Sequence, residues 1–317
     1  MENTQKISLI TGGAGFIGAN LVYRLLSLGH EVHVVIHSGS NLWRLKKIIS
    51  DIELHEIDIT KFDEVRGVLE KVKPTNIFHL AHYGGNAGQS DIKKVRKVII
   101  EGTATLYNAC VGIDSIKSII NTGSSSEYGK KSELMREDML VEPNTEYAVA
   151  KVWATLYGEH CVREKNLPII TARLFSVYGP FEHRNRFMTE VILACLSGQM
   201  PKLANPKTVR DFVYIDDAID ALIDLSLSHR VGGVYNVGSG KESNLEEVAN
   251  IIAKNTDFKD ELEWGSYDNR SFDTTKWQAD ISHIEREIDW KPKTNLDEGI
   301  KKTVEWFKEN MELYQNL

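Results

Sequence analysis

A glycine-rich stretch at residues 11–18 constrains the fold of this chain more than any other part of its sequence. It follows a short apolar run at residues 7–10 and opens into residues 19–26, where apolar side chains recur at helical spacing. The sequence therefore predicts the order strand, glycine-rich turn, helix. This order favours a dinucleotide-binding turn, and an ordinary glycine-rich βα turn is the alternative.

Three glycines of the stretch have separate tasks in such a turn. Gly12 permits the tight turn, Gly15 lets the backbone approach a pyrophosphate, and Gly18 lets the helix pack against the strand. The first turn of the helix adds free N–H groups and a partial positive charge, both of which favour phosphate. We therefore predict that a dinucleotide lies over this turn.

Strand-like and helical segments alternate along the first half of the chain. Runs typical of buried strands occur at residues 7–10, 31–36, 52–57, 76–80, 118–122 and 167–174. The alternation predicts an α/β fold with a Rossmann-like, doubly wound parallel sheet whose ligands bind at the carboxyl ends of the strands. Elements beyond residue 175 are shorter, which predicts a smaller mixed α/β lobe. We expect a cofactor domain over 1–175 and a substrate lobe over 176–317, with part of 208–240 packing back on the first domain.

The charge pattern argues against several partners. The 317 residues carry a formal net charge of −7 without a basic block, so we expect no nucleic-acid partner. Neither a membrane-span-length apolar run nor a signal-peptide core is present, and no metal-ligand spacing stands out. Cys110, Cys161 and Cys195 lie far apart in apolar helical contexts, so we expect buried thiols in a reducing, cytoplasmic compartment.

Tyr147 and Lys151 form the strongest local signal after the glycine turn. Their spacing in a predicted helix places both side chains on one face. A neighbouring ammonium favours the phenolate of a tyrosine, whose reference pKa is about 10, and so suits Tyr147 to proton exchange with a substrate oxygen. A surface Tyr/Lys pair is the alternative. Residues 122–129 add serine hydroxyls at the end of a strand, where an ordinary polar turn is also an option.

These stretches together resemble the extended short-chain dehydrogenase/reductase superfamily, in its nucleotide-sugar epimerase/dehydratase/reductase group. The resemblance covers nearly the whole chain and rests on motifs in the expected order: 11–18, 79–81, 122–129, Tyr147 with Lys151, 173–180, 209–217 and 235–240. It implies an NAD(P) cofactor and a nucleotide-sugar substrate. It also implies a homodimer in which helices at 91–111 and 147–165 pair across a two-fold axis, and burial of their apolar stripes in the core of the monomer is the alternative.

The resemblance implies roles for individual residues. Ser124 is similar to the catalytic Ser/Thr, Tyr147 to the acid/base, and Lys151 to the residue that holds the nicotinamide ribose. The implied cofactor contacts are Gly12, Gly15, Phe16, Ile17, Asp58, Ile59, Leu80, Ala81, Tyr147, Lys151, Phe175 and Val177. The implied substrate contacts are Ser125, Ser126, Arg210 and Arg270. The two arginines suit phosphates because guanidinium pairs with them bidentately, and surface salt bridges are their alternative.

The residues after the strand at 31–36 favour NADP(H). In NAD enzymes an acidic residue at this point reads the ribose 2′-hydroxyl. Here His37 and Ser38 follow instead, and Arg44 comes on the next helix, expected at 41–49, so we expect these three to hold a 2′-phosphate. NAD(H) bound without the carboxylate is the alternative.

The positions after Ser124 disfavour dehydration. Dehydratases of the group carry an Asp-Glu or Ser-Glu pair there, whereas this chain has Ser125 and Ser126. Glu127 comes one place later and, in an extended segment, would face the other way. The loops at 123–129 and 83–86 look most like those of nucleotide-4-keto-6-deoxyhexose reductases.

We therefore expect an NADP(H)-dependent oxidoreductase that reduces the 4-keto group of a nucleotide-linked 4-keto-6-deoxyhexose, with Tyr147 as proton donor. A nucleotide-sugar 4-epimerase with tightly bound NAD, acting through a transient 4-keto intermediate, is the first alternative. A non-catalytic NADP(H)-sensing regulator is the second. His82 and His183 are interpreted as polar loop residues outside the catalytic set.

Overall fold

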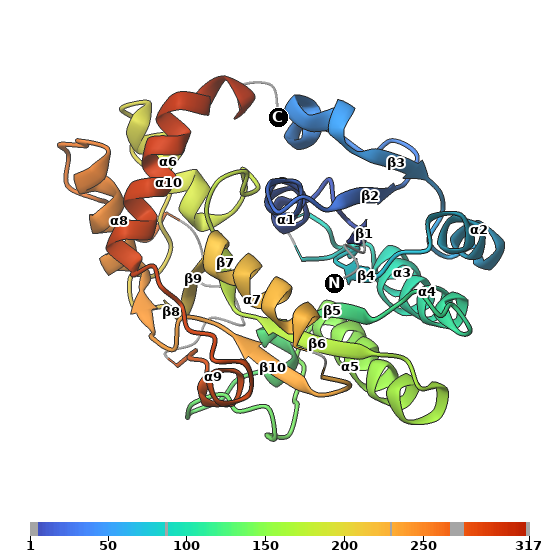
Figure 1. Ribbon diagram of the computed structural model, residues 1–317. Helices are drawn as coiled ribbons and strands as arrows, with labels where there is room; N and C mark the ends of the chain where they lie inside the picture. Colours follow the sequence, from blue (N-terminus) through green and yellow to red (C-terminus); the bar gives the residue numbers. More distant parts are fainter. Residues whose placement is uncertain (1–5, 86–87, 229, 267–275, 315–317) are drawn as a thin grey trace.

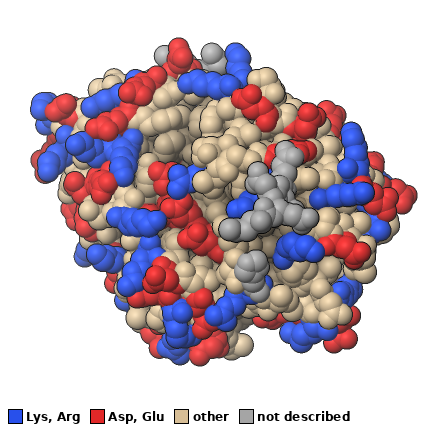
Figure 2. Space-filling view, viewed as in Figure 1, with Lys and Arg blue, Asp and Glu red and all other residues tan. Residues whose placement is uncertain are grey.

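The computed structural model describes residues 6–85, 88–228, 230–266 and 276–314. Figure 1 shows a central sheet with helices on both faces and a second, smaller lobe beside it. Acidic and basic side chains are interspersed over the face in Figure 2, without a continuous basic stripe. Among the helices described, none combines the length and apolar character that a membrane span requires. Arg270 lies outside the described residues.

Seven parallel strands form the central sheet in the order β10-β6-β5-β4-β1-β2-β3. The strands are β1 (Ile7–Thr11), β2 (Glu31–Ile36), β3 (Glu53–Glu56), β4 (Asn76–His79), β5 (Ser118–Ser124), β6 (Ile169–Leu174) and β10 (Val234–Val237). The expected Rossmann-like fold is confirmed. Strand order reverses between β1 and β4, and ligands of such folds bind outside the carboxyl ends at that point.

Successive strand residues face opposite sides of the sheet, and helices cover both. Ile10 packs in a cluster with residues of α1 (Phe16–Ser27) and α7 (Ile215–Leu227). Its neighbour Leu9 packs in a second cluster with α2 (Phe62–Val72), α4 (Gly102–Cys110) and α5 (Glu146–Lys165). Burial on both faces explains why the central strands are largely apolar, whereas the edge strand β3 is more exposed and contains Glu53, His55 and Glu56.

Two helical expectations differ from the structure in detail. The single helix expected at 91–111 consists of α3 (Ile92–Val95), a π-helical segment η2 (Arg96–Glu101) and α4. Next to the wider turn lies Gly102, where a Cβ would come within 2.9 Å of the Ile59 side chain. The helix expected at 41–49 is a 3-10 segment, η1 (Trp43–Asp51), interrupted at Ile48 by non-helical torsions.

The second lobe combines helices with short strand pairs. β7 (Ser176–Tyr178) pairs with β9 (Phe212–Tyr214), and β8 (Val209–Arg210) pairs with β11 (Ser243–Asn244). Its helices are α6 (Phe187–Leu196), α8 (Leu245–Asn255), α9 (Ser282–Ile288) and α10 (Leu296–Asn310), followed by the 3-10 turn η4 (Met311–Tyr314). Helices α6 and α10 both contact α8 (Figure 1).

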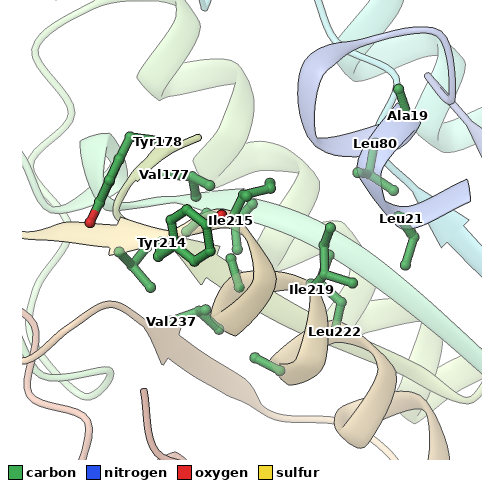
Figure 3. Close-up of a cluster of buried hydrophobic side chains, with 14 of the residues drawn as sticks. Ala19, Leu21, Leu80, Val177, Tyr178, Tyr214, Ile215, Ile219, Leu222 and Val237 are labelled. Atoms are coloured by element: carbon green, nitrogen blue, oxygen red, sulfur yellow. The ribbon is translucent and has the colours of Figure 1, made fainter. Parts of the chain in front are cut away.

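One continuous core joins this lobe to the sheet. After β9 the chain returns to the sheet, where α7 covers one face and β10 pairs with β6 at the edge. The same cluster contains Leu21 of α1, Leu80 after β4, Tyr178 of β7 and Ile219 of α7 (Figure 3). The lobe is therefore held against the carboxyl edge of the sheet by buried apolar contacts.

Candidate active site

The glycine turn between β1 and α1 has no room for side chains at Gly12 and Gly18. Gly12 has φ +72°, and a Cβ there would lie 2.7 Å from backbone atoms of Leu80 and Ala81. A Cβ on Gly18 would overlap the carbonyl of Gly12. The N-cap of α1 is Gly15, which provides no side-chain hydrogen bond, so the first N–H groups of the helix are open to a phosphate. The turn thus fits a dinucleotide pyrophosphate.

Strand β4 ends beside this turn and is tied to β1. The Leu80 N–H donates to the Thr11 carbonyl at 3.0 Å, and the Ala81 N–H donates to Thr11 Oγ1 at 3.2 Å. His79 is buried between Thr11 Oγ1 and Thr103 Oγ1, at 2.7 and 2.9 Å. Burial lowers the pKa of His79 to about 3, so this ring is neutral and supports the shape of the site.

The turn after β3 contains Asp58 and Ile59. The Asp58 carboxylate accepts hydrogen bonds from the backbone and hydroxyl of Thr60, at 3.0 and 2.7 Å, and pairs with Lys97 at 3.1 Å. These contacts, led by those to Thr60, lower the pKa of Asp58 to about 2. Ile59 packs against Gly102 of α4, at the same edge of the sheet as the glycine turn.

The residues after β2 divide into two groups. His37 and Ser38 are exposed in a turn, where His37 Nδ1 lies 2.7 Å from the Ser38 carbonyl. Arg44, in contrast, is 9% exposed, and its guanidinium donates to the carbonyls of Phe181 at 2.8 Å and Ala14 at 3.4 Å. The expectation that Arg44 presents its charge to a cofactor phosphate is therefore wrong, because the side chain joins two loops in the interior.

Four other implied cofactor contacts are apolar. Phe16 and Ile17, in the first turn of α1, are partly buried against the core. Phe175 and Val177, beyond the carboxyl end of β6, are each 5% exposed. Within the described ranges, no group of three or more His, Cys, Asp or Glu side chains is arranged to hold a metal ion.

Ser124, Tyr147 and Lys151 converge at the carboxyl end of β5. Ser124 is the last residue of β5, and Tyr147 lies in the first turn of α5. Lys151, one turn further along α5, is 5% exposed and donates through Nζ to the Thr122 carbonyl at 2.7 Å. Its ammonium lies 5.9 Å from the centre of the Tyr147 ring. The structure thus brings together the three residues that the sequence singled out.

Burial dominates the titration of this group. It raises the pKa of Tyr147 to about 12, although a hydrogen bond to Ser124 acts in the opposite direction. It also lowers the pKa of Lys151 to about 8, which the nearby Glu127 carboxylate opposes. The lowered tyrosine pKa that we expected from the neighbouring lysine is therefore not found in the chain alone, because desolvation outweighs the effects that favour the phenolate. Tyr147 is a neutral phenol at neutral pH and can donate a proton.

The serine loop differs from the expected extended segment. Residues Ser125–Tyr128 form a 3-10 turn, η3, with Ser124 as its N-cap. The turn directs Glu127 inward, where it is 0% exposed and accepts from the Ser124 N–H at 2.8 Å. The same carboxylate pairs with Arg173 of β6 at 2.9 Å. The expected extended geometry is therefore wrong, but the 3-10 turn also keeps the Glu127 carboxylate away from the surface.

Two of the implied substrate residues that the structure describes, Ser125 and Arg210, contact one indole ring. Ser125 Oγ accepts from Trp277 Nε1 at 3.2 Å, and the Arg210 guanidinium lies 5.3 Å from the centre of the Trp277 ring. Ser126 is partly buried in η3, where its N–H donates to Ser124 Oγ at 3.2 Å. Trp277 was not singled out from the sequence, because an isolated tryptophan carries no motif.

Sequence reasoning also missed Arg186 and set His82 aside. Arg186, the N-cap of α6, donates to the Gly85 carbonyl at 3.4 Å, and its charge acts to lower the pKa of Tyr147. The His82 ring lies 6.2 Å from that of Tyr147, and desolvation, together with the nearby Lys151 charge, lowers its pKa to about 4 although the residue is exposed. His82 follows β4 at the edge of the sheet where the other site residues lie, and only this position could have indicated it from the sequence. No local signal indicated Arg186.

Known proteins resemble the chain over nearly its full length. A trifunctional UDP-glucose 4,6-dehydratase/UDP-4-keto-6-deoxy-D-glucose 3,5-epimerase/UDP-4-keto-L-rhamnose-reductase of Arabidopsis thaliana is 29% identical across 98% of this chain, which spans only 48% of that protein. A UDP-glucose 4-epimerase of Mycolicibacterium smegmatis is 30% identical, with 95% of this chain and 98% of the relative covered.

A solved structure agrees with these relatives. The UDP-glucose 4-epimerase of Thermotoga maritima, crystallised with UDP-glucose, superposes with a TM-score of 0.86 at 25% identity, covering 96% of this chain and 99% of the other. The model of the NAD dependent epimerase/dehydratase family matches residues 8–238, which include the glycine turn and the Ser124, Tyr147 and Lys151 group. The chain therefore belongs to the NAD dependent epimerase/dehydratase family, among the nucleotide-sugar enzymes of the extended short-chain dehydrogenase/reductase superfamily.

Proposed function

We propose that this enzyme reduces the 4-keto group of a nucleotide-linked 4-keto-6-deoxyhexose. The observation that carries the proposal is the partly buried, protonated Tyr147, hydrogen-bonded to Ser124 at the carboxyl end of β5. A reduction needs a proton donor at the substrate oxygen when hydride reaches the carbon. A tyrosine whose pKa is raised to about 12 is in the required protonation state throughout the neutral range.

Each residue of the group has a defined task in this reaction. NADPH, when bound, supplies the hydride to C4. Tyr147 gives its phenolic proton to the 4-oxygen, so the carbonyl becomes a hydroxyl. The Ser124 hydroxyl donates a hydrogen bond to the same oxygen and orients the carbonyl. Lys151, held by the Thr122 carbonyl, places a positive charge that stabilises the phenolate left on Tyr147.

Several contacts argue against dehydration, an activity that some relatives carry. Dehydration needs an acid and a base beside the catalytic hydroxyl, and this chain has Ser125 and Ser126 there. The nearest carboxylate in sequence, Glu127, is fully buried and paired with Arg173. It accepts hydrogen bonds and is not exposed to a sugar.

The cofactor proposal rests on the turn after β2. No carboxylate follows Ile36 there, so a 2′-phosphate meets no repulsion, and the exposed His37 and Ser38 offer it hydrogen bonds. With Arg44 engaged elsewhere, these two residues carry the preference for NADPH alone.

Epimerisation at C4 is the second candidate. It uses the same Ser124, Tyr147 and Lys151 to oxidise and then reduce C4 with a retained NAD. The full-length similarity to the Mycolicibacterium smegmatis UDP-glucose 4-epimerase favours it. NAD that copurifies and survives gel filtration would favour this candidate over reduction.

The test is a panel of nucleotide sugars and their 4-keto-6-deoxy derivatives, incubated with NADPH or NADH while the absorbance of the reduced nicotinamide is followed. Stoichiometric consumption of NADPH supports the proposal, and isomerised product without consumption supports epimerisation.

Tyr147→Phe should lower turnover about 10²–10⁴-fold while cofactor affinity persists. Tyr157→Phe, on the same helix with its hydroxyl 3.3 Å from Asn108 Oδ1, is the control and should retain activity. Retained turnover in Tyr147→Phe would contradict the mechanism.

We further propose a homodimer formed through α5. Val149 and Leu156 on this helix are 49% and 55% exposed, and Ile92 at the start of α3 is 44% exposed. Light scattering should give twice the mass of the 35.8 kDa chain. Leu156→Glu should shift the protein towards the monomer.

A further inference from the structure

Behind Ser124 lies a carboxylate that no catalytic role yet explains. Glu127 Oε1 accepts from the Ser124 N–H at 2.8 Å, and Glu127 Oε2 accepts from Thr155 Oγ1 and Arg173 Nε, each at 2.9 Å. Glu127 is 0% exposed and Arg173 is 5% exposed. One buried carboxylate therefore joins the catalytic loop to α5 and to β6.

Stability alone is a poor reason for this arrangement. Removing two charges from water carries a large desolvation cost, and an apolar pair of similar volume often stabilises a fold as well or better. Glu127 also belongs to the turn that begins at Ser124. Its hydrogen bond with the Ser124 N–H therefore fixes the orientation of the Ser124 backbone at the start of that turn. The Glu127 charge also lies close enough to act on Tyr147 and Lys151.

The charged and titratable groups around Tyr147 come from several elements. Glu127 lies behind it in η3, Lys151 is one turn along α5, His82 lies in the loop after β4, and Arg186 begins α6. The Glu127 charge acts to raise the pKa of both Tyr147 and Lys151, whereas Arg186 acts to lower that of Tyr147. Glu127 is thus an anion that acts on both Tyr147 and Lys151, whereas Arg186 pairs with Glu182 at 3.5 Å.

We propose that Glu127 is a positioning residue for the reaction: its carboxylate fixes the Ser124 backbone so that the hydroxyl faces Tyr147, and its charge, paired with Arg173, stands behind both residues. This inference rests on the proposed function. Glu127 does not touch the substrate, so it acts on turnover through Ser124 and Tyr147 and leaves substrate binding intact.

The test compares the pH dependence of turnover in three variants. Glu127→Gln keeps an oxygen for the Ser124 N–H but leaves the Arg173 charge unbalanced. The alkaline limb of kcat, where Lys151 loses its charge and Tyr147 loses its proton at higher pH, should move down by about one pH unit. The Glu127 charge acts to raise the pKa of both groups, and a nearby charge shifts a pKa by about 1–3 units. We expect kcat to fall about tenfold or more at the optimum, with KM within about twofold of the parent.

Two matched variants separate charge from shape. Glu127→Gln/Arg173→Gln removes both charges, so the local balance is restored and the alkaline limb should return close to its original position. This double variant also lacks a buried unpaired ion, so it tests the proposal if the single variant folds poorly. Thr155→Val removes one hydrogen bond to the same carboxylate and keeps the charge pair, so it should not move the limb.

A readout without substrate distinguishes failure of this inference from failure of the proposed function. Phenolate absorbance of each protein, minus that of its Tyr147→Phe derivative, reports the ionisation of Tyr147. Between pH 8 and 11, Tyr147 of the Glu127→Gln variant should begin to ionise about one pH unit below Tyr147 of the parent. If the parent and Glu127→Gln titrate together, the inference is overturned, whether or not a substrate has been found. An equal loss of kcat at every pH, without a shift, would also overturn it and leave Glu127 a purely structural residue.

Discussion

The turns after β1 and β5 flank β4 at the same edge of the sheet, but they are held by opposite means. The first depends on missing side chains, because a Cβ on Gly12 or Gly18 would meet backbone atoms. The second depends on buried charge, because the Glu127 carboxylate holds the Ser124 N–H and pairs with Arg173. Steric fit thus shapes the turn proposed to hold the cofactor, and electrostatics shapes the turn proposed to carry catalysis.

This difference determines how each turn responds to change. The glycine turn is held by close packing, so its stability should not depend on pH, and added side-chain atoms should distort it. A charged turn fails when one partner is removed, and its failure depends on the protonation of the partner that remains. The three variants below test the contrast, in order of decreasing effect on the free energy of unfolding.

Arg173→Met should have the largest effect. It leaves the Glu127 carboxylate buried without its cation, which costs about 3–5 kcal/mol when the carboxylate is ionised. Burial raises the folded-state pKa of Glu127, so this cost is complete above that raised pKa. It disappears as the pH falls below the unfolded pKa of about 4.3, because both states are then protonated. Urea unfolding at pH 8 and pH 4 measures the difference.

The control for this variant is a surface arginine. Arg136 pairs with Asp138 at 3.2 Å with its side chain 48% exposed, so Arg136→Met should cost less than about 1 kcal/mol at either pH. A pH-independent loss in Arg173→Met would mean that packing, and not the charge of Glu127, holds the catalytic turn.

Gly18→Ala should have an intermediate effect on stability and a large one on the cofactor. The new Cβ would overlap the Gly12 carbonyl and lie 2.7 Å from the Gly13 Cα, so α1 must shift because backbone cannot turn aside. Overpacking of this kind costs about 1–3 kcal/mol. The shift also displaces the N–H groups proposed to face the cofactor phosphates, so NADPH affinity measured by calorimetry should fall about tenfold or more, as a loss of about 1.4 kcal/mol implies.

Gly67→Ala is the matched control for Gly18→Ala. Gly67 lies in α2, and a Cβ added there would have no heavy atom within 4 Å, so alanine should stabilise the helix by about 0.5–1 kcal/mol. Unchanged NADPH affinity in Gly18→Ala would show that the turn tolerates a methyl group and would remove the steric half of the contrast.

The same contrast explains what the sequence could predict. The glycine turn, the parallel sheet and the Tyr147/Lys151 spacing depend on residues that are close together in the chain or on simple periodicity, and the structure agrees with them. The Glu127–Arg173 pair joins positions 46 residues apart, and no local pattern reports it.

Arg44 shows the same limit from the other side. Its place after β2 suggested a phosphate contact, but the side chain donates to the Phe181 carbonyl, 137 residues away in the sequence. Local chemistry predicted a cation at this edge of the sheet, whereas tertiary packing decided which way it points. The η3 turn is a similar case, because its Glu127 is drawn inward by β6 and α5.

Lys97→Ala should have the smallest effect, at the turn after β3, which is held by local hydrogen bonds. The Asp58–Lys97 pair spans 3.1 Å, but its side chains are 39% and 52% exposed, so its loss should cost less than about 1 kcal/mol. The two bonds from Thr60 to Asp58 persist, and they contribute most to its lowered pKa, so that pKa should stay below its usual range. Thr60→Val removes the shorter bond, at 2.7 Å, and should cost more than Lys97→Ala in urea unfolding at neutral pH. The reverse order would mean that charge, and not local hydrogen bonding, holds this third turn as it holds the one after β5.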